Sequence, residues 1–324
     1  MNLTALSRDD ILFYAEFARL GGNPGELRAL VNRRQLVRIR RGAYVTRDRW
    51  ESMDDRERHI VRVRAVVADH RSPALVSGVS AAALHGFPHR GELPAEVSLL
   101  RPHAGGGKTE PGVRQTSAGG MPAVWDVIDG IETTTIARTT LDLARTLPFA
   151  DGVACADWAL REERVSREEL QAELARTRFR AGRARIHRVV DFAVDVSGSY
   201  GESMARAVIH ELGFEAPVLQ CEFVDAEGSM FGDFYWRGPR ALAEFDGFVK
   251  FSNPEFSDGD PVAALWKEKR REDRLRKQVN GVARLVWNHV FNPHALAAEL
   301  ERIGVPRGPR NRLMGGAISG SPSR

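Results

Sequence analysis

The sequence predicts a mixed α/β (α+β) protein with three folded regions and a tail. Residues 7–50 predict helix, turn, arginine-rich helix and basic hairpin, and residues 51–196 mix short strands with helices. Residues 197–305 predict helix, three strands, helix, strand and helix. The 324 residues suffice for two or three hydrophobic cores. We therefore expect domains over 1–50, 51–196 and 197–305, and a disordered, Gly/Pro/Ser-rich basic tail over 306–324.

Composition narrows the class of protein. Hydrophobic residues make up 43% and charged residues 28%, an ordinary balance for a soluble globular protein. The first residues lack a signal-peptide pattern, and no apolar run reaches the roughly 18 residues of a membrane helix. We expect a cytoplasmic protein with no membrane partner. Cys155 and Cys221 lie far apart without a CxxC partner, so we expect buried or idle thiols, with a disulfide as the alternative.

The first 46 residues predict a winged helix-turn-helix. Ser7 and Asp10 resemble a capping box, and the apolar positions that follow predict a helix over 7–20. Asn23 and Pro24 are a natural N-cap and first residue of a second helix. Next, "VRIRRGAYVT" alternates apolar residues with arginine, as expected of a hairpin with basic edges. This order of elements is that of a winged helix-turn-helix.

The second helix and the hairpin predict contact with DNA. Arginine and Asn/Gln side chains read guanine and adenine edges, whereas arginines of a wing contact phosphates. The expected contacts of the helix and its end are Arg28, Asn32, Arg33, Arg34 and Gln35, and those of the wing are Arg38, Arg40 and Arg41. The alternative is a small structural domain with a basic surface.

The middle region predicts alternating strands and helices. "SPALVSGVSAAALHGFP" predicts a short strand and a helix that stops at Gly86, "AEVSLLRP" and "VWDVIDGIETTT" predict strands, and "IARTTLDLARTLP" predicts a helix. Ser166 and Glu169 form a capping-box pattern. "HAGGGKT" lacks the first glycine of a phosphate-binding loop, so we interpret it as a hairpin loop. His85 has no Cys or His neighbours, which argues against zinc.

The order of elements over residues 1–145, with "SGVSAAALHGF" and "TTTIARTTLDLA", resembles the AbiEi-type antitoxin regulators of type IV toxin–antitoxin systems. The resemblance implies a winged helix joined to a mixed α/β domain, binding to the protein's own promoter DNA and a possible cognate toxin. It leaves the oligomeric state open.

Three carboxylates gather on two expected strands, 231–236 and 240–247. Glu244 and Asp246 point the same way along one strand, and a Gly-Pro turn brings Asp233 near Glu244. Like charges opposed across strands repel, unless a cation lies between them. Mg²⁺, or Mn²⁺ in its place, prefers such oxygen ligands and can activate water for phosphodiester hydrolysis. Glu202 opens a helix that could join the site, and Lys250 could hold the attacking water.

Residues 197–303 resemble the PD-(D/E)XK nuclease superfamily, nearest to its branch of very-short-patch-repair-like endonucleases. The resemblance is carried by Glu202 on a first helix, "GDF", "EFDG", the charged "EKRREDRLR" and "GVARLVW". It implies a restriction-endonuclease-like sandwich with a central mixed sheet, and catalytic and metal-binding roles for Asp233, Glu244 and Glu202. Asp246 stands where many members carry a lysine, so Lys250 or Lys269 would have to supply that charge, or activity is impaired.

Two hypotheses follow. In the first, the chain is a Mg²⁺-dependent DNA endonuclease delivered by its winged helix, with Lys269 and Arg271 of the charged helix along the nucleic-acid backbone. The metal would be held by Glu202, Asp233, Glu244 and Asp246, and Lys250 would aid the water. In the alternative, it is an AbiEi-like regulator whose nuclease fold is inactive. RNA is a third possible substrate. Each acid also has a structural alternative: Ser199 and Glu202 form a capping-box pattern, and the strand acids can be a turn residue and a solvated edge.

Overall fold

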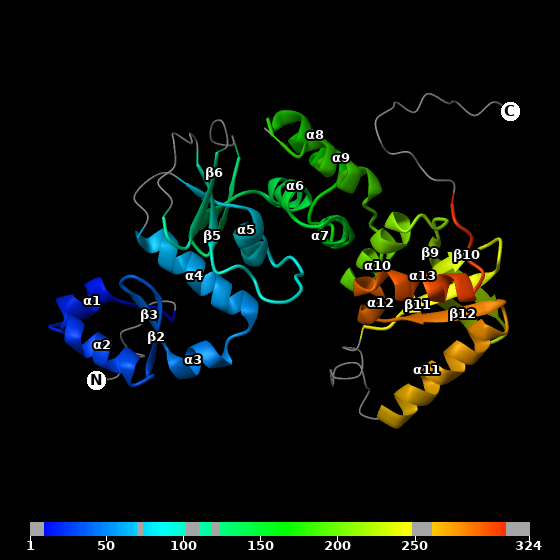
Figure 1. Ribbon diagram of the computed structural model, residues 1–324, viewed down its shortest axis with the longest axis horizontal. Helices are drawn as coiled ribbons and strands as arrows, with labels where there is room; N and C mark the ends of the chain where they lie inside the picture. The colour runs from blue at the N-terminus through cyan, green and yellow to red at the C-terminus, as the bar shows by residue number, and fades with distance from the viewer. Residues whose placement is uncertain are drawn as a thin grey trace. The chain divides into compact units, whose positions relative to one another are not determined.

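The computed structural model describes residues 10–69, 74–101, 110–117, 124–179, 181–247 and 261–308, with Trp266 the only described side chain in 261–268. The chain divides into two compact units, unit 1 (Met1–Phe192) and unit 2 (Ala193–Arg324) (Figure 1). The described residues form helices and three sheets, which confirms the predicted α+β class. Within them, no helix combines the length and the apolar character that crossing a membrane requires.

Unit 1 begins with the elements of a winged helix. They are β1 (Leu12–Phe13), α1 (Tyr14–Arg19), α2 (Pro24–Asn32), β2 (Leu36–Arg40) and β3 (Ala43–Thr46), and the sheet order is β1-β3-β2. Leu12, Phe17, Leu27 and Leu36 are buried together, so α1, α2 and the sheet share one core. Gly22 lies against the ring of Phe17, where a Cβ would come within 2.2 Å, so a larger residue would displace α1.

The predicted helix over 7–20 is wrong over residues 10–13. Residues 11–13 are extended, and Leu12 and Phe13 pair with Tyr44 and Ala43 of β3. The chain turns at Asp10 (φ 68°), and the helix starts only at Tyr14. Consecutive buried residues at 11 and 12 fit a strand as well as a helix, and the strand partner lies about thirty residues away. The predicted cap at Ser7 lies outside the described residues.

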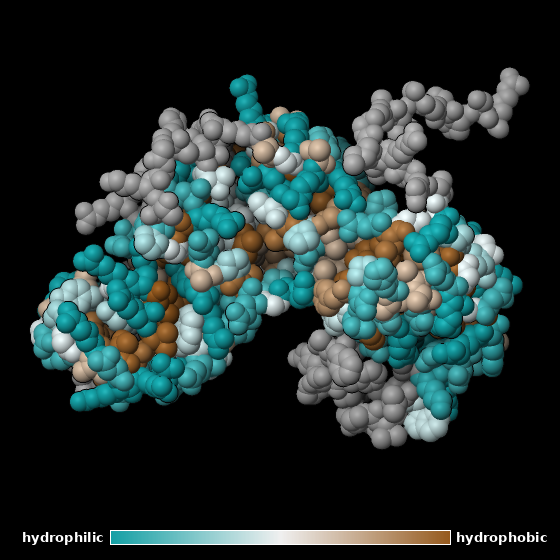
Figure 2. Space-filling view, in the orientation of Figure 1, coloured by the Kyte–Doolittle hydropathy of each residue, from teal (hydrophilic) through white to brown (hydrophobic). Residues whose placement is uncertain are grey.

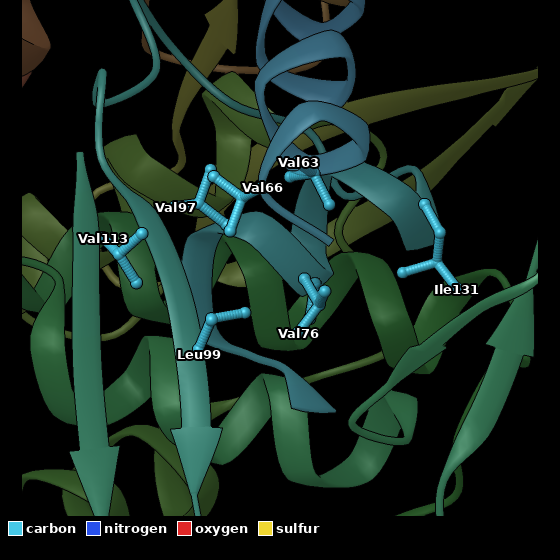
Figure 3. Packing of buried hydrophobic residues seen from close by; sticks show 8 residues of the cluster. Val63, Val66, Val76, Val97, Leu99, Val113 and Ile131 are labelled. Carbon is cyan, nitrogen blue, oxygen red and sulfur yellow. The ribbon is translucent and has the colours of Figure 1, made fainter. Parts of the chain in front are cut away.

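A five-stranded sheet follows in unit 1. Its strands, in the order β6-β5-β4-β8-β7, are β4 (Leu75–Val76), β5 (Val97–Arg101), β6 (Val113–Ser117), β7 (Asp126–Ile128) and β8 (Ile131–Thr133). Three helices precede or interrupt it: α3 (Arg47–Ser52), α4 (Asp55–Asp69) and α5 (Gly78–His85). Val63 and Val66 of α4 belong to one buried cluster with Val76, Val97 and Leu99 (Figure 3). The sequence did not predict β6, which pairs in parallel with β5. The loop 103–109 lies outside the described residues.

Four helices complete unit 1: α6 (Ile136–Thr146), α7 (Phe149–Arg161), α8 (Arg167–Arg176) and α9 (Arg183–Phe192). The capping box of Ser166 and Glu169 at the start of α8 is confirmed. The side chain of Arg138, buried in α6, donates to Asp142 at 3.3 Å and lies 4.0 Å from Glu173 of α8, so a buried charge network joins these helices. Cys155 on α7 is a buried free thiol and Cys221 a half-buried one.

Unit 2 is a mixed four-stranded sheet with helices. Its elements are α10 (Tyr200–Glu211), β9 (Val218–Asp225), β10 (Gly228–Trp236), β11 (Ala241–Phe245), α11 (Pro261–Arg276), β12 (Gly281–Leu285), α12 (Trp287–Phe291) and α13 (Pro293–Arg302). The order is β12-β11-β10-β9, with β11 and β12 parallel and the other pairs antiparallel. Gly201 of α10 lies so close to Phe245 that a Cβ would come within 2.1 Å of the ring, which fixes the start of α10 against β11.

Residues 306–308, which the sequence assigns to the tail, form backbone pairs in unit 2. Arg307 pairs with Phe214, and the Glu215 amide donates to the Pro306 carbonyl at 3.0 Å. The Arg307 guanidinium donates to the Leu212 carbonyl at the end of α10. Backbone pairing therefore includes residues up to Gly308 in unit 2, whereas residues 309–324 lie outside the described residues.

Candidate functional site

Helix α2 and the residues at its end carry the side chains that the sequence predicts to contact DNA. The Asn23 side chain accepts from the amides of Gly25 and Glu26 at 2.8 and 3.1 Å, which confirms the predicted cap, and Pro24 follows as the first helical residue. Buried Leu27 fixes the rotation of the helix against the core. The predicted contacts of this helix and its end are all exposed: Arg28, Asn32, Arg33, Arg34 and Gln35.

The three arginines of the wing differ in how far their side chains are exposed. Arg38 and Arg41 are exposed, whereas the side chain of Arg40 is only 18% exposed. The Arg40 guanidinium lies 2.8 Å from Glu110 and 3.2 Å from Asp69. Arg40 thus anchors the wing to the remainder of unit 1, which differs from the phosphate contact expected for it.

The exposed arginines of this surface lack acidic partners. Within the described ranges of the chain, no ion pair involves Arg28, Arg33, Arg34, Arg38 or Arg41. Neighbouring arginines that face other parts of unit 1 do pair: Arg47 with Glu51, Arg49 with Asp10 and Glu57, and Arg64 with Asp129. The surface formed by Arg28, Asn32, Arg33, Arg34, Gln35, Arg38 and Arg41 is called the basic surface below.

The acids of unit 2 lie at one end of the β10–β11 ladder. The ladder pairs Phe234 with Ala243, so Asp233 and Glu244 follow next to it on the two strands. Asp233 accepts from the Phe245 amide through Oδ2 at 2.7 Å and from the Gln220 side chain through Oδ1 at 3.2 Å. The carboxylate of Asp233 thereby takes the place of a backbone acceptor at the end of the ladder.

Gln220 joins two of the predicted acids, and the sequence did not single it out. Its Nε2 donates to Glu202 at 2.8 Å as well as to Asp233. Gln220 has a φ of 44°, in the left-handed region that favours glycine, and with Asp233 it is missing from the register of β9 and β10. The positive φ of a non-glycine residue within a strand distinguishes Gln220 in the structure, but nothing in the local sequence predicts it.

Glu202 caps its own helix. Its carboxylate accepts from the Gly198 amide and the Ser199 hydroxyl, both at 2.9 Å, while the Ser199 hydroxyl accepts from the Glu202 amide at 3.2 Å. Half of the capping box considered for the S-x-x-E pattern is therefore present, while the Glu202 carboxylate bonds the Gly198 amide in place of the Ser199 amide. This arrangement is compatible with a second role only because Gln220 connects the carboxylate to Asp233.

The other two acids, Glu244 and Asp246, each form an ion pair with an arginine. Arg271 of α11 donates to Glu244 at 2.7 Å and to the Phe231 carbonyl at 3.0 Å, and Glu244 is 8% exposed. Arg284 of β12 donates to Asp246 at 3.0 Å and to Glu272 at 3.0 Å. Guanidinium groups supply the positive charge that the sequence led us to expect from a metal ion.

The acids therefore do not form the expected metal cluster in this structure. Among the residues that the structure describes, no group of three or more acidic, His or Cys side chains lies close enough to hold a metal ion. Lys250 falls outside the described residues. Lys269 is exposed on α11, with its ammonium 5.5 Å from the ring centre of Trp266. The Mg²⁺ or Mn²⁺ site stays a prediction.

Comparison with known proteins gives one family match, which lies within unit 1. Residues 74–192, from β4 to α9, match the family model of the AbiEi antitoxin C-terminal domain. The "Uncharacterized protein Rv2248" and "Uncharacterized protein MT2308" of Mycobacterium tuberculosis are each 28% identical over 231 residues, which is 69% of this chain and 78% of theirs. The crystal structure of the RV2827C protein from Mycobacterium tuberculosis has 15% identity and a TM-score of 0.38, covering 63% of this chain and 78% of that one. In its sheet and helical region, the chain is thus similar to an AbiEi antitoxin domain.

Proposed function

We propose that the chain is a DNA-binding regulator of the AbiEi antitoxin type, which binds promoter DNA through the basic surface and has a cognate toxin as its partner. The match of residues 74–192 to an AbiEi antitoxin domain supports the class. The observation that carries the proposal is the set of five exposed arginines on α2 and the wing, unpaired among the described residues. Ion pairs within a chain neutralise guanidinium groups, so unpaired ones are available to phosphates and base edges.

DNA binding tests this proposal. Fluorescence anisotropy with a duplex from the upstream promoter should show binding by the full chain that the double variant Arg33→Ala/Arg34→Ala loses by roughly 100-fold. Each lost contact to a phosphate or base is worth about 1–2 kcal/mol. The matched control is Arg114→Ala, an exposed arginine of β6 paired only with the exposed Glu96, which should bind like the unaltered chain. Unchanged binding in the double variant would remove the basic surface from the account.

A second candidate is metal-dependent hydrolysis of DNA phosphodiesters by unit 2. The hydrogen bonds through Gln220 that link Glu202 to Asp233, next to Glu244, favour it. Asp233, Glu244 and Asp246 would hold Mg²⁺ or Mn²⁺, which would lower the pKa of a bound water and stabilise charge on the phosphate. Arg271 and Lys269 would then lie near the nucleic-acid backbone.

Plasmid nicking separates the two candidates. Hydrolysis predicts Mg²⁺-dependent nicking by the full chain that disappears in Asp233→Ala and in Glu244→Ala. Equal residual nicking by both variants would assign the cleavage to a contaminant or to another site. Promoter binding without nicking would support the regulator and contradict the hydrolase.

A further inference from the structure

Unit 1 contains a cavity of about 1070 Å³ beside the basic surface. Elements α1, α2, β2 and β3 form one wall, and α4 with the turn between β7 and β8 forms the other. The volume lies just above the range typical of small-molecule sites, roughly 300–1,000 Å³. Figure 2 shows hydrophobic surface gathered over β3 in unit 1 and framed by hydrophilic residues. This cavity is called the wing cavity below.

The walls of the wing cavity suit a flat ring. Phe13, Tyr14 and Tyr44 line it from the winged helix, and Tyr14 is 37% exposed although it is a large aromatic residue. Across from them, Ala65 and Ala68 of α4 line it with short side chains that leave room. Aromatic walls of this kind stack on planar groups.

The charge of the wing cavity suits an anion with several negative charges. Three carboxylates line it, and each pairs with an arginine: Glu16 with Arg19 at 3.8 Å, Asp69 with Arg40 at 3.2 Å and Asp129 with Arg64 at 3.1 Å. Three further arginines line it, Arg28, Arg38 and Arg41, and none of them has an ion pair among the described residues. Arg38 has only its Nε engaged, with the Arg40 carbonyl at 3.3 Å.

We infer that the wing cavity binds a small oligophosphate carrying an aromatic ring, which by its chemistry is a nucleotide. Guanidinium groups bind phosphate through paired hydrogen bonds, and three of them match the charge of a di- or triphosphate. The ring lies along the wall of Phe13 and Tyr14. The same chemistry is present at the end of a DNA strand, so the ligand has two possible sources, a free nucleotide or DNA.

A regulatory consequence rests on the proposed DNA-binding function. Arg28, Arg38 and Arg41 belong to both the wing cavity and the basic surface. A nucleotide that occupies them removes three of the five unpaired arginines from DNA, so the two ligands compete. Binding of the nucleotide itself requires no DNA function.

Calorimetry on the full chain tests the site directly, with ATP, pyrophosphate, adenosine and citrate as probes. We expect ATP to bind more tightly than pyrophosphate, and neither adenosine nor citrate to bind comparably. Arg28→Ala and Arg41→Ala should each weaken ATP about tenfold, since each removes a charge-assisted contact. Arg33→Ala removes the same charge from the end of α2 without lining the cavity, and should leave ATP binding unchanged.

Tyr14→Ala tests the ring wall, and should weaken ATP but not pyrophosphate. The inference is overturned if ATP gives no binding heat at millimolar concentration, if Arg33→Ala weakens ATP as much as Arg41→Ala, or if citrate binds as tightly as ATP. Circular dichroism of each variant checks that unit 1 remains folded, and an unfolded Arg41→Ala is replaced by Arg41→Gln.

Competition then separates the two sources and the two proposals. ATP should displace a fluorescent promoter duplex in proportion to its occupancy of the cavity. If ATP binds and DNA affinity does not change, the shared use of the arginines is wrong. If ATP binds and no duplex binds at all, the DNA-binding proposal fails while the nucleotide site stands. If a blunt duplex with 5′-phosphates binds, but free ATP does not, the nucleotide inference is overturned and the arginines of the wing cavity serve DNA alone.

Discussion

Two arginine-rich stretches of this chain differ in what their side chains contact. On the winged helix, the arginines of the basic surface are exposed and unpaired among the described residues. On α11, Arg271, Arg274 and Arg276 each pair with a carboxylate, of Glu244, Asp225 and Glu272 respectively. Arg271 and Arg274 thereby connect α11 to the sheet of unit 2, Arg276 pairs within its own helix, and the arginines of the basic surface face outward.

The difference teaches that local charge density does not identify a nucleic-acid surface. Both stretches have the composition of one. The two stretches differ in whether carboxylates of the same chain already pair with their arginines. In unit 2 the buried carboxylate of Glu244 does so for Arg271, and Asp246 does so for Arg284.

The largest effect is expected at the pair of Arg271 and the buried Glu244. Arg271→Ala removes a guanidinium, itself 31% exposed, that donates to a carboxylate only 8% exposed, and losing one charged partner of a buried group costs about 3 kcal/mol. Hydrogen exchange of the β11 amides should report that loss as a lower opening free energy. Arg276→Ala, on the same helix, removes an arginine that is 55% exposed, and should cost less than about 1 kcal/mol. Equal losses in the two variants would mean that the α11 arginines are not structural in the way we describe.

The scaffold of the basic surface should weaken in acid. His59 is buried, with its ring nitrogens 2.9 Å from the Pro94 carbonyl and 2.8 Å from the Ser80 hydroxyl, and burial lowers the pKa of His59 to about 4. Burial lowers the pKa of His85 in the same way. Below the unfolded pKa of about 6.5, only the unfolded chain takes up the proton, so unfolding free energy falls as pH drops toward 4.

For His59 alone this loss reaches about 3 kcal/mol, and it is absent above pH 6.5. Urea unfolding of the full chain at pH 7 and at pH 4.5 measures it. The variant His59→Gln should be less stable at pH 7 and less sensitive to pH. A pH dependence as steep as that of the unaltered chain would show that His59 is not the group responsible.

The smallest expected effect is the difference in DNA binding between variants of Arg41 and Arg40, two neighbouring arginines of the wing. Arg41→Ala should lower promoter affinity several-fold and reduce the salt dependence by about 0.9, the value for one phosphate contact. Arg40→Ala should leave both nearly unchanged, because Arg40 is already paired with Asp69 and Glu110. Anisotropy titrations at several salt concentrations compare the two. Equal effects would show that the ion pairs of Arg40 open on DNA.

The sequence predicts the elements of unit 2 well because each carries its own periodicity and turn. The expected strands over 231–236 and 240–247 coincide with β10 and β11. The predictions fail where a distant partner decides the structure. Residues 12–13 form a strand because β3 pairs with them, and β6 forms because β5 lies beside it.

The same limit applies to the candidate sites. The acids at 233, 244 and 246 are visible in the sequence because they lie close together on two strands. Their partners are not visible, since Arg271 lies 27 residues from Glu244, and Arg284 lies 38 from Asp246. The sequence also predicts the arginines of the winged helix as a group, but the pairing of Arg40 depends on Glu110, 70 residues away.

The salt dependence of promoter binding tests the central claim most directly. A variant in which Arg28, Arg33, Arg34, Arg38 and Arg41 are all replaced by alanine should reduce the slope of log K against log salt by up to about 4.5, since each arginine that neutralises a phosphate contributes about 0.9. Circular dichroism shows whether the variant is folded. A folded variant with the slope and affinity of the unaltered chain would contradict the account.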